Sequence, residues 1–523
     1  MFNVREERRE LYRSIWKSCE DLRGSMDGYE MKNYIFVMMF YRFMSESFVY
    51  WFSKSEWDDG NKDFDYANLS DEEAIPWKED AVKKKGFFML PSQLFGNVLK
   101  KVIEDQHFAE EINTCLPKIF RAVENSSIGF SSEEDIKGLL TSVSWDDVKL
   151  GTVVLERNKK IVEVMKAIGG SKFDFISEHE IDVLGEAYEH LMEQYASTSG
   201  KKGGEFYTPP EVSRLLTKIA VGDKTYISGG VYDPACGSGS LLLKCVNLLG
   251  AKNVSEMCGQ EKNMTTYNLC RMNMFLHGVN YNKFDIRHGD TLEYPDPAHS
   301  KKRFEIIVSN PPYSAKWAGE DDVKLLTDPR FEQVGALAPK SAADFAFILH
   351  CLHLLSSTGK AVIVCATGVL TRLGKEKHIR KWLISQNYIE SVIYLAPKLF
   401  YGTGVSVVIM ILSKSKSDSN VLFVDATNIF IKDRNQNRLS DENIAQILKI
   451  YRERVNVPFV AKVASNKEIE GKGYDMGMKA YIESPVKTEV VDIAALNKDI
   501  DDAVERINNL RSNVNEIIKE IEC

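Results

Sequence analysis

Apolar residues recur with helical spacing through the first third of the chain. The segment from residue 34 to residue 52 is dense in apolar and aromatic residues but contains Arg42 and Glu46. Those two charges make the segment unsuited to cross a membrane, so the pattern predicts a buried, aromatic-rich helix. More segments with the same spacing follow it. Together they indicate a helical N-terminal domain over residues 1–165.

The spacing of apolar residues changes after about residue 230. Short apolar runs now alternate with segments of helical spacing, and each run has the length of one buried strand. The runs cover residues 231–232, 257–259, 284–286, 304–308, 361–365, 391–395 and 405–412. This alternation is typical of an α/β fold with a largely parallel sheet and helices on both faces. We expect this domain to span residues 166–415 and to bind ligands at the carboxyl ends of its strands.

The end of the chain carries a regular repeat of apolar residues. After a mixed extension at residues 416–483, apolar side chains recur at alternating steps of three and four residues. They are Ile493, Leu496, Ile500, Ala503, Ile507, Leu510, Val514, Ile517 and Ile521. This heptad seam predicts a helix of roughly 40 Å within residues 484–523, at about 1.5 Å per residue. A helix of that length favours binding to a partner, and packing within the chain is the alternative.

The composition sets bounds on function. The net charge is −8 and the pI about 5.8, which argues against tight DNA binding by this chain alone. A local basic surface, or a partner that supplies positive charge, is compatible with these values. The nine cysteines include no CxxC pair, and His350 and His353 have no evident third ligand. We therefore expect a reduced, cytoplasmic protein with no metal site, no signal peptide and no membrane span.

Residues 231–242 have the pattern of a strand, a glycine-rich turn and the start of a helix. Gly237, Ser238 and Gly239 form the turn, where glycine lets the backbone approach a ligand closely. The spacing matches neither the dinucleotide-binding turn nor the phosphate loop of ATP-hydrolysing proteins. Asp233, at the end of the strand, suits the ammonium group of a ligand such as S-adenosylmethionine. On its own, such a turn is as often purely structural.

Acidic residues also follow the next two predicted strands. Glu261 comes after the second strand, where a carboxylate typically accepts hydrogen bonds from two ribose hydroxyls. Asp290 comes after the third strand and can accept a hydrogen bond from the adenine amine of the cofactor. A solvated carboxylate and a turn residue are the simpler alternatives. Upstream, a segment that could close over the cofactor, or simply begin a helix, consists of Glu205, Phe206, Tyr207, Thr208 and Pro209.

The most specific segment is the tetrad Asn310, Pro311, Pro312 and Tyr313, at the end of the fourth predicted strand. Proline cannot continue a central strand, so the chain leaves the sheet in a stiff loop. An aromatic amine is a poor nucleophile because its lone pair is delocalised into the ring. The Asn310 side-chain oxygen and the Pro311 carbonyl could accept hydrogen bonds from its two N–H groups and localise that pair. Tyr313 would stack on a base flipped out of a duplex.

With these motifs, the chain resembles the methylase (modification) subunits of type I restriction–modification systems, a group of DNA adenine-N6 methyltransferases. The resemblance covers most of the chain. It rests on Asp21 to Gly24, Tyr41 to Phe43, Leu184 to Glu189, Gly204 to Pro209, Asp233 to Gly239, Asn310 to Tyr313, Ala343 to Phe347 and Leu399 to Gly404. The glycine-rich turn is generic to methyltransferases, the tetrad is specific to amine methylation, and the remaining segments are specific to this family.

The resemblance implies a Rossmann-like, S-adenosylmethionine-dependent methyltransferase domain that modifies N6 of adenine in DNA. It implies that the cofactor site is lined by Glu205 to Pro209, Asp233, Gly237 to Gly239, Glu261 and Asp290, and that Asn310 to Tyr313 act on adenine. It also implies that two such chains join one DNA-specificity subunit, while a separate restriction subunit carries the motor and nuclease.

Other functions are open at this point. The same tetrad serves methylation of glutamine amides in proteins and of base amines in RNA, and a DNA methyltransferase can also act without partners. A non-catalytic binder derived from this fold is a further alternative, which the intact tetrad disfavours. The segments that frame the tetrad, together with the helical N-terminal domain, favour adenine in DNA.

Overall fold

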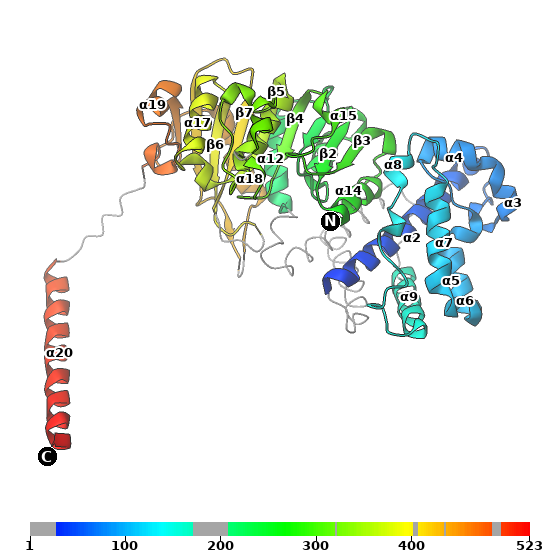
Figure 1. Ribbon diagram of the computed structural model, residues 1–523, viewed down its shortest axis with the longest axis horizontal. Coiled ribbons are helices and arrows are strands. Elements are labelled where there is room, and N and C mark those ends of the chain that lie inside the picture. The colour runs from blue at the N-terminus through cyan, green and yellow to red at the C-terminus, as the bar shows by residue number, and fades with distance from the viewer. Residues whose placement is uncertain are drawn as a thin grey trace. The chain divides into compact units, whose positions relative to one another are not determined.

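Most of the chain forms one unit, and the C-terminal helix forms a second. This computed structural model describes residues 28–170, 208–319, 322–400, 406–433, 436–483 and 493–522. The first unit spans Met1–Ile482 and contains a helical region and a large sheet, and the second spans Glu483–Cys523 (Figure 1). The two units are described separately below.

The aromatic segment forms one long helix, α2 (Gly28–Asp58). The helix is covered by neighbouring elements, and Phe36, Phe40 and Phe48 are each at most 1% exposed. Burying each such ring contributes roughly 1.5–3 kcal/mol of stability. The predicted buried, aromatic-rich helix is therefore confirmed. Within the described residues, no helix is long and apolar enough to cross a membrane.

Shorter helices pack around α2. They are α3 (Asp71–Ala74), α4 (Lys78–Lys85), α5 (Phe95–Glu104), α6 (Gln106–Glu110), α7 (Ile112–Asn125), α8 (Glu133–Ile136) and α9 (Val154–Gly169). Between them lie the 3-10 helices η1 (Tyr66–Asn68), η2 (Ile75–Trp77), η3 (Pro91–Gln93) and η4 (Leu140–Ser142). Helix α3 begins with a capping box, in which Ser70 and Glu73 each accept the other's backbone N–H. The helical N-terminal region predicted from the sequence is present.

A nine-stranded sheet forms the centre of the second region. Its strands are β1 (Val231–Asp233), β2 (Met257–Glu261), β3 (Phe284–His288), β4 (Phe304–Ser309), β5 (Leu355–Ala366), β6 (Ile389–Leu395), β7 (Val407–Ser413), β8 (Asn420–Ala426) and β11 (Ala461–Ser465). They lie in the order β11-β8-β6-β7-β5-β4-β1-β2-β3. A separate hairpin pairs β9 (Ile431–Lys432) with β10 (Asn437–Arg438).

The pairing of the strands confirms a largely parallel α/β sheet. Strands β3, β2, β1, β4 and β5 are parallel neighbours, and β6 is parallel to β8. Strand β7 is antiparallel to β5 and β6, and β11 is antiparallel to β8. All seven predicted apolar runs form strands. Residues 416–483, predicted as a separate extension, contribute β8 and β11 to this same sheet, so the sheet crosses the domain boundary predicted at residue 415.

Helices cover both faces of the sheet. One face packs against α12 (Pro210–Val221), α13 (Ser240–Leu249) and α18 (Asp441–Glu453). The opposite face packs against α15 (Pro297–Ser300), α16 (Asp344–Leu354), α17 (Lys375–Ser385) and α19 (Asn466–Gly471). Short 3-10 helices in the connections are η6 (Ala251–Asn253), η7 (Tyr281–Lys283), η9 (Val323–Thr327), η10 (Glu332–Val334), η11 (Thr367–Leu370) and η12 (Met478–Ala480).

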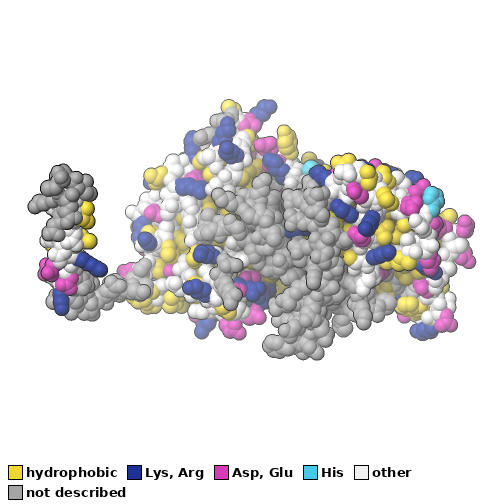
Figure 2. Space-filling model, turned by 90° about the horizontal axis from the view of Figure 1, so that it is seen from below, with side chains coloured by type: hydrophobic (Ala, Val, Ile, Leu, Met, Phe, Trp, Pro, Cys, Tyr) yellow, Lys and Arg dark blue, Asp and Glu magenta, His cyan; other side chains and the backbone are white. Residues whose placement is uncertain are grey.

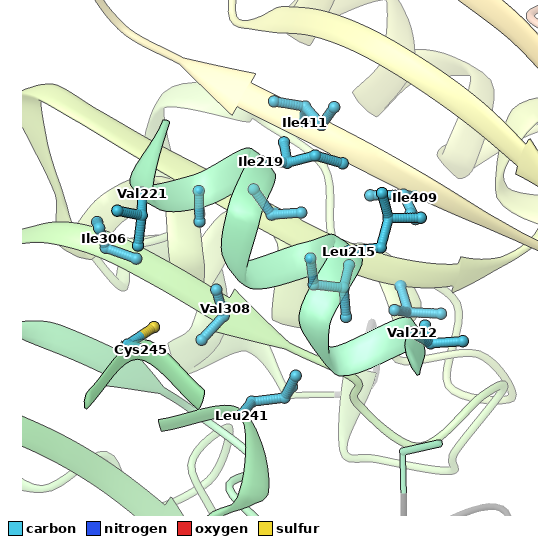
Figure 3. Packing of buried hydrophobic residues seen from close by; sticks show 14 of the residues in the cluster. Val212, Leu215, Ile219, Val221, Leu241, Cys245, Ile306, Val308, Ile409 and Ile411 are labelled. Atoms are coloured by element: carbon cyan, nitrogen blue, oxygen red, sulfur yellow. The ribbon is translucent and has the colours of Figure 1, made fainter. Parts of the chain in front are cut away.

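Alternate residues of the central strands enter two different cores. In β7, Ile409 and Ile411 face the α12 side, whereas Val408 and Met410 face the α16 side. Figure 3 shows Ile409 and Ile411 packed against side chains of α12, including Leu215. Because a strand side chain points to alternate faces, burial on both sides requires the continuous apolar runs seen in the sequence.

Helix α14 (Met264–Leu276) joins the helical region to the sheet. Its residues Leu269, Met272 and Leu276 belong to the same core as α2. The Arg271 guanidinium is buried and donates to the backbone carbonyls of three residues of the helical region, Glu134, Asp135 and Lys137, at 2.8, 3.2 and 3.0 Å. The helix that follows β2 is therefore fixed to the N-terminal helices.

In the second unit, residues 493–522 form helix α20 (Ile493–Glu522), as the heptad pattern predicted. Its apolar side chains remain accessible, with Ile500 52%, Ile507 55% and Leu510 60% exposed. Figure 2 shows yellow hydrophobic side chains along one side of this helix. A single exposed apolar stripe on a 30-residue helix is typical of a coiled-coil seam.

Candidate active site

The carboxyl ends of β1, β2, β3 and β4 lie at one edge of the sheet, because these neighbouring strands run parallel. The predicted turn, the two predicted acidic residues and the tetrad each follow one of these strands. Ser309, the last residue of β4, donates its hydroxyl to Asp233 Oδ1 of β1 at 2.7 Å. This hydrogen bond ties the start of the tetrad to the start of the glycine-rich turn.

Glycine is required at residue 239 by close packing against α14. Gly239 has φ +79°, and a Cβ there would lie 2.8 Å from both Cys270 Sγ and Met274 Cε. Gly239 is also the residue from which α13 begins. The backbone of the turn therefore approaches α14 more closely than any side chain would allow.

The Asp233 carboxylate lies beneath the turn. The residue is 1% exposed, and its Oδ1 accepts hydrogen bonds from the Ala235 N–H at 3.0 Å and from Ser309. Burial raises the pKa of Asp233 to about 7, against the stabilising effect of these two donors. In this structure Asp233 holds the turn in place, whereas the predicted contact with a cofactor ammonium stays a prediction.

Replacing Asp233 by asparagine is expected to change how stability depends on pH. The folded state binds the Asp233 proton more tightly than the unfolded chain, where the pKa is 3.8, so wild-type stability falls as pH rises from about 4 to about 7. The asparagine side chain keeps an accepting oxygen and does not ionise. The variant's stability relative to the wild type should therefore rise over this window, by up to roughly 4 kcal/mol at about 1.4 kcal/mol per pH unit. Urea unfolding of both proteins between about pH 4 and about pH 8 measures this difference, and parallel curves would contradict the assignment.

Glu261, at the end of β2, faces the turn. Its Oε2 accepts the Gly237 N–H at 3.0 Å, and its Oε1 accepts the Asn263 N–H at 2.8 Å. Burial raises the pKa of Glu261, and these backbone donors oppose the rise. The carboxylate is thus held at the mouth of the turn with both oxygens oriented by the backbone, and its predicted contact with ribose hydroxyls stays a prediction.

Asp290 lies at the end of β3, on the other side of Glu261. Its Oδ1 accepts the Leu292 N–H at 2.9 Å, and its Oδ2 pairs with the Lys262 ammonium at 2.8 Å. The Lys262 side chain is 73% exposed. The exposed Lys262 ammonium can move away from Asp290 Oδ2 into solvent. An amine of a ligand can then donate a hydrogen bond to Asp290 in its place.

A cavity of about 150 Å³ lies among these residues. Four predicted site residues line it: Glu261, Asp290, Asn310 and Pro312. The volume is below the roughly 300 Å³ of a typical ligand pocket, so a nucleoside-sized ligand requires the wall to open. The cavity brings the two acids and the tetrad to one place.

The apolar wall of the cavity was not predicted from the sequence. It includes Trp317, which is 6% exposed and donates its indole N–H to the Pro339 carbonyl, and Phe347 of α16. Lys316, which also lines the cavity, is exposed. These residues come from a loop and a helix that fold back over the strand ends. Phe347 is part of the segment Ala343 to Phe347, which supported the family resemblance but did not indicate a role in ligand binding.

Hydrogen bonds fix the side chain of Asn310, which is 8% exposed. Its Nδ2 donates to Thr208 Oγ1 at 3.1 Å, and its Oδ1 accepts the Tyr313 hydroxyl at 2.7 Å. Burial raises the pKa of Tyr313 well above its usual range, so the phenol stays protonated and donates. The contact with Thr208 turns the amide oxygen of Asn310 toward Tyr313. An incoming amine would meet this oxygen by displacing the hydroxyl.

The upstream segment is only partly within the described residues. Glu205, Phe206 and Tyr207 lie outside them, whereas Thr208 and Pro209 lie next to the start of α12. Thr208 was predicted to line the cofactor site, and in the structure it contacts Asn310. Pro209 precedes the first residue of α12, as its alternative structural role predicted.

The histidines considered as metal ligands have protein partners. His350 lies 3.0 Å from the Tyr232 hydroxyl, and burial lowers its pKa well below the usual range. Among the described residues, one group has the spacing of metal ligands, Cys258, Asp285 and His299. The Lys302 ammonium already lies 3.4 Å from Cys258 Sγ and 3.5 Å from Asp285 Oδ2. A positive charge is therefore supplied there by the chain itself.

Comparison with known proteins places this geometry in a family. The model of the N-6 DNA Methylase family matches residues 179–489, and that of the HsdM N-terminal domain matches residues 11–168. The chain is 41% identical to the type I restriction enzyme MpnII methylase subunit of Mycoplasma pneumoniae, over 99% of this chain and 97% of that protein. The chain belongs to the type I methylase subunits. The family inferred from the motifs is thereby confirmed.

Solved structures agree with this assignment. A type I restriction–modification methyltransferase subunit from Streptococcus thermophilus superposes with a TM-score of 0.81 and 31% identity, covering 91% of this methylase subunit and all of that chain. The MjaVIII methylase subunit of Methanocaldococcus jannaschii is 32% identical over 67% of this chain and 61% of its own length. The similarity thus extends over both the helical region and the sheet.

Proposed function

We propose that this methylase subunit transfers a methyl group from S-adenosylmethionine to N6 of adenine in DNA, within a type I restriction–modification complex. The observation that carries the proposal is that Asn310 lines one cavity together with Glu261 and Asp290. A hydrogen-bond acceptor for an amine therefore adjoins carboxylates suited to a nucleoside. The family assignment supports DNA as the substrate.

The residues around the cavity fit this cofactor. Glu261 offers oriented carboxylate oxygens for the ribose hydroxyls, and Asp290 offers an acceptor for the adenine amine. Trp317 and Phe347 provide apolar surface for a planar ring. When bound, the cofactor supplies an electrophilic methyl group on a positively charged sulfur. Gly237, Ser238, Gly239 and Asp233 act by shaping the turn against which it lies.

The tetrad prepares the nucleophile. Asn310 Oδ1 and the Pro311 carbonyl accept hydrogen bonds from the two N–H groups of the target amine, which favours a lone pair localised on nitrogen. The bond between N6 and the methyl carbon forms as the bond from that carbon to sulfur breaks. The nitrogen is then cationic and releases one proton to water, so no strong base is required. Tyr313 leaves Asn310 and stacks on the flipped base.

Partners complete this activity. The apolar stripe of α20 is exposed, and we assign it to coiled-coil packing against a DNA-specificity subunit, in a complex of two methylase chains with one such subunit. In the described part of the face drawn in Figure 2, Lys and Arg side chains are interspersed with Asp and Glu. With a net charge of −8, the chain would obtain much of its DNA affinity from the partner, and a separate restriction subunit would supply cleavage. In this proposal the helical region 1–165 and the sheet region 166–415, completed by strands from residues 416–483, form the enzyme, and residues 484–523 bind the partner.

Sequencing of native DNA tests the function. Genomic DNA from hosts with and without this chain's gene is sequenced by a method that reads N6-methyladenine. We expect methyladenine to disappear at one motif composed of two half-sites when the gene is deleted. An unchanged map in an expressing host would contradict DNA as the substrate. Loss at a continuous motif would contradict recognition by a separate type I specificity subunit.

A further inference from the structure

The loop that leaves the tetrad is held by a charged pair from two distant elements. Ser314, directly after Tyr313, has φ +51°, in the left-handed region that residues other than glycine rarely adopt. Its N–H donates to Asp344 Oδ1 at 3.3 Å, and its hydroxyl accepts from Arg372 Nη2 at 3.2 Å. The backbone of Ser314 is thus fixed by Asp344 and its side chain by Arg372, and neither of these residues belongs to the loop.

Asp344 is the first residue of α16 and is 4% exposed. Among the residues that the structure describes, its Oδ2 has no hydrogen-bond partner, and it lies 3.6 Å from Arg372 Nη1. A buried carboxylate oxygen without a hydrogen bond is costly, and the helix N-terminus and the nearby guanidinium reduce that cost only in part. A second link, from the Ala343 N–H to the Ala315 carbonyl at 2.9 Å, joins the same helix end to the same loop.

The position of Arg372 is equally specified. Its Nη1 donates to Glu376 Oε1 at 3.1 Å, and the Glu376 side chain is 3% exposed. A Cβ at Gly368 would lie 2.6 Å from Arg372 Nε, so an alanine at residue 368 would displace the guanidinium from its present position. None of these residues lines the cavity at the strand ends.

We propose that Asp344 and Arg372 are positioning residues that hold the tetrad loop in the conformation from which Asn310 and Tyr313 receive the target base. The inference rests on the proposed function and adds two residues to it. Neither touches the reacting atoms; both act through Ser314. The buried, incompletely bonded carboxylate of Asp344 is retained because it fixes a strained backbone at the point where the loop meets the base.

The test uses the methylase in its complex with the specificity subunit. The substrate is an unmethylated duplex that contains the complex's target motif. Asp344→Asn keeps an accepting oxygen and loses the charge. We expect its single-turnover rate of methyl transfer to fall about 10- to 30-fold, while the dissociation constant for S-adenosylmethionine changes by a clearly smaller factor, since Ser314, Asp344 and Arg372 do not line the cavity themselves. Fluorescence of 2-aminopurine at the target position should report weaker base capture.

Arg372→Gln should give a similar loss, and Arg372→Lys should recover part of it. Because the two residues act as one unit, the double variant Asp344→Asn, Arg372→Gln should be no slower than the slower single variant. Gly368→Ala displaces the Arg372 guanidinium and leaves Asp344 and Arg372 themselves unchanged. If Asp344→Asn does not fold, this variant tests whether the pair positions the loop. Glu332→Gln, a carboxylate-to-amide change at an exposed residue, is the matched control and should leave the rate unchanged.

An unchanged rate in Asp344→Asn and Gly368→Ala would overturn the inference, as would additive losses or an equal loss of cofactor affinity. These outcomes differ from a failure of the proposed function. In that case the wild-type complex itself would transfer no methyl group to adenine.

Discussion

Asn310→Ala is expected to lower the rate of methyl transfer by roughly 10²- to 10³-fold, the effect of removing one preorganised polar group from an active site. The amide oxygen is the acceptor that we propose for the amine, and its direction is set by the hydrogen bond from Nδ2 to Thr208 Oγ1. Alanine removes both the acceptor and this orientation. The affinity for S-adenosylmethionine should change less than about twofold, because Glu261 and Asp290 remain in place.

The measurement is transfer of labelled methyl groups in a single turnover, with cofactor binding followed separately by calorimetry. Asn310→Asp keeps an accepting oxygen but loses the donor to Thr208, so its rate should lie between those of the wild type and Asn310→Ala. Asn282→Ala, at an exposed residue, is the surface control. A rate of Asn310→Ala close to that of the wild type would show that this oxygen is not the acceptor.

Glu261→Gln is expected to weaken cofactor binding by about 10²-fold. Hydrogen bonds to a charged acceptor contribute roughly 1.5–3 kcal/mol, and about 1.4 kcal/mol corresponds to a factor of ten in affinity. The carboxylate also accepts the N–H groups of Gly237 and Asn263, and an amide NH₂ cannot accept at one of these positions. The variant therefore loses hydrogen bonds to the cofactor, and it also loses part of the backbone contacts that orient the turn.

Isothermal titration with S-adenosylmethionine measures this loss, and the rate at saturating cofactor should recover to within about tenfold of the wild type. Glu293→Gln is the matched control, because Glu293 is an exposed carboxylate on the same stretch of chain as Asp290. Equal affinity in Glu261→Gln and Glu293→Gln would exclude Glu261 from the cofactor site. A lower rate at saturating cofactor with unchanged affinity would instead indicate that Glu261 acts in the methyl-transfer step.

The seven predicted strands and the buried helix α2 follow from local patterns of apolar residues. A strand buried on both faces must be apolar at every position, and a helix covered on all sides must be apolar all around, so each has a signal within its own segment. Strands β8 and β11 were placed in a separate extension, although β8 is as long as the correctly predicted β6. Strand β8 joins the main sheet by pairing with β6, and β11 joins it by pairing with β8; no pattern within either segment specifies these pairings.

The wall of the cavity illustrates the same limit at the site. Trp317 and Phe347 belong to different elements, and their approach to Glu261 depends on how the chain from β4 to β5 folds back over the strand ends. Thr208 could be recognised as part of a motif, but its hydrogen bond to Asn310 spans 102 residues. Contacts of this range have no local periodicity from which they could be predicted.

The sequence by itself determined the fold class, the family, the tetrad and the acids at the ends of β2 and β3, because each depends on residues close together in the chain. Only the tertiary structure decided that Asp233 lies buried beneath the turn, that Tyr313 covers the Asn310 oxygen, and that Asp344 and Arg372 hold Ser314. Some of these contacts join segments that are far apart in the sequence. The contact between Asn310 and Tyr313 depends on the directions of their side chains. They arise when the parallel strands bring their carboxyl ends to one edge, where packing and burial select one partner for each polar group.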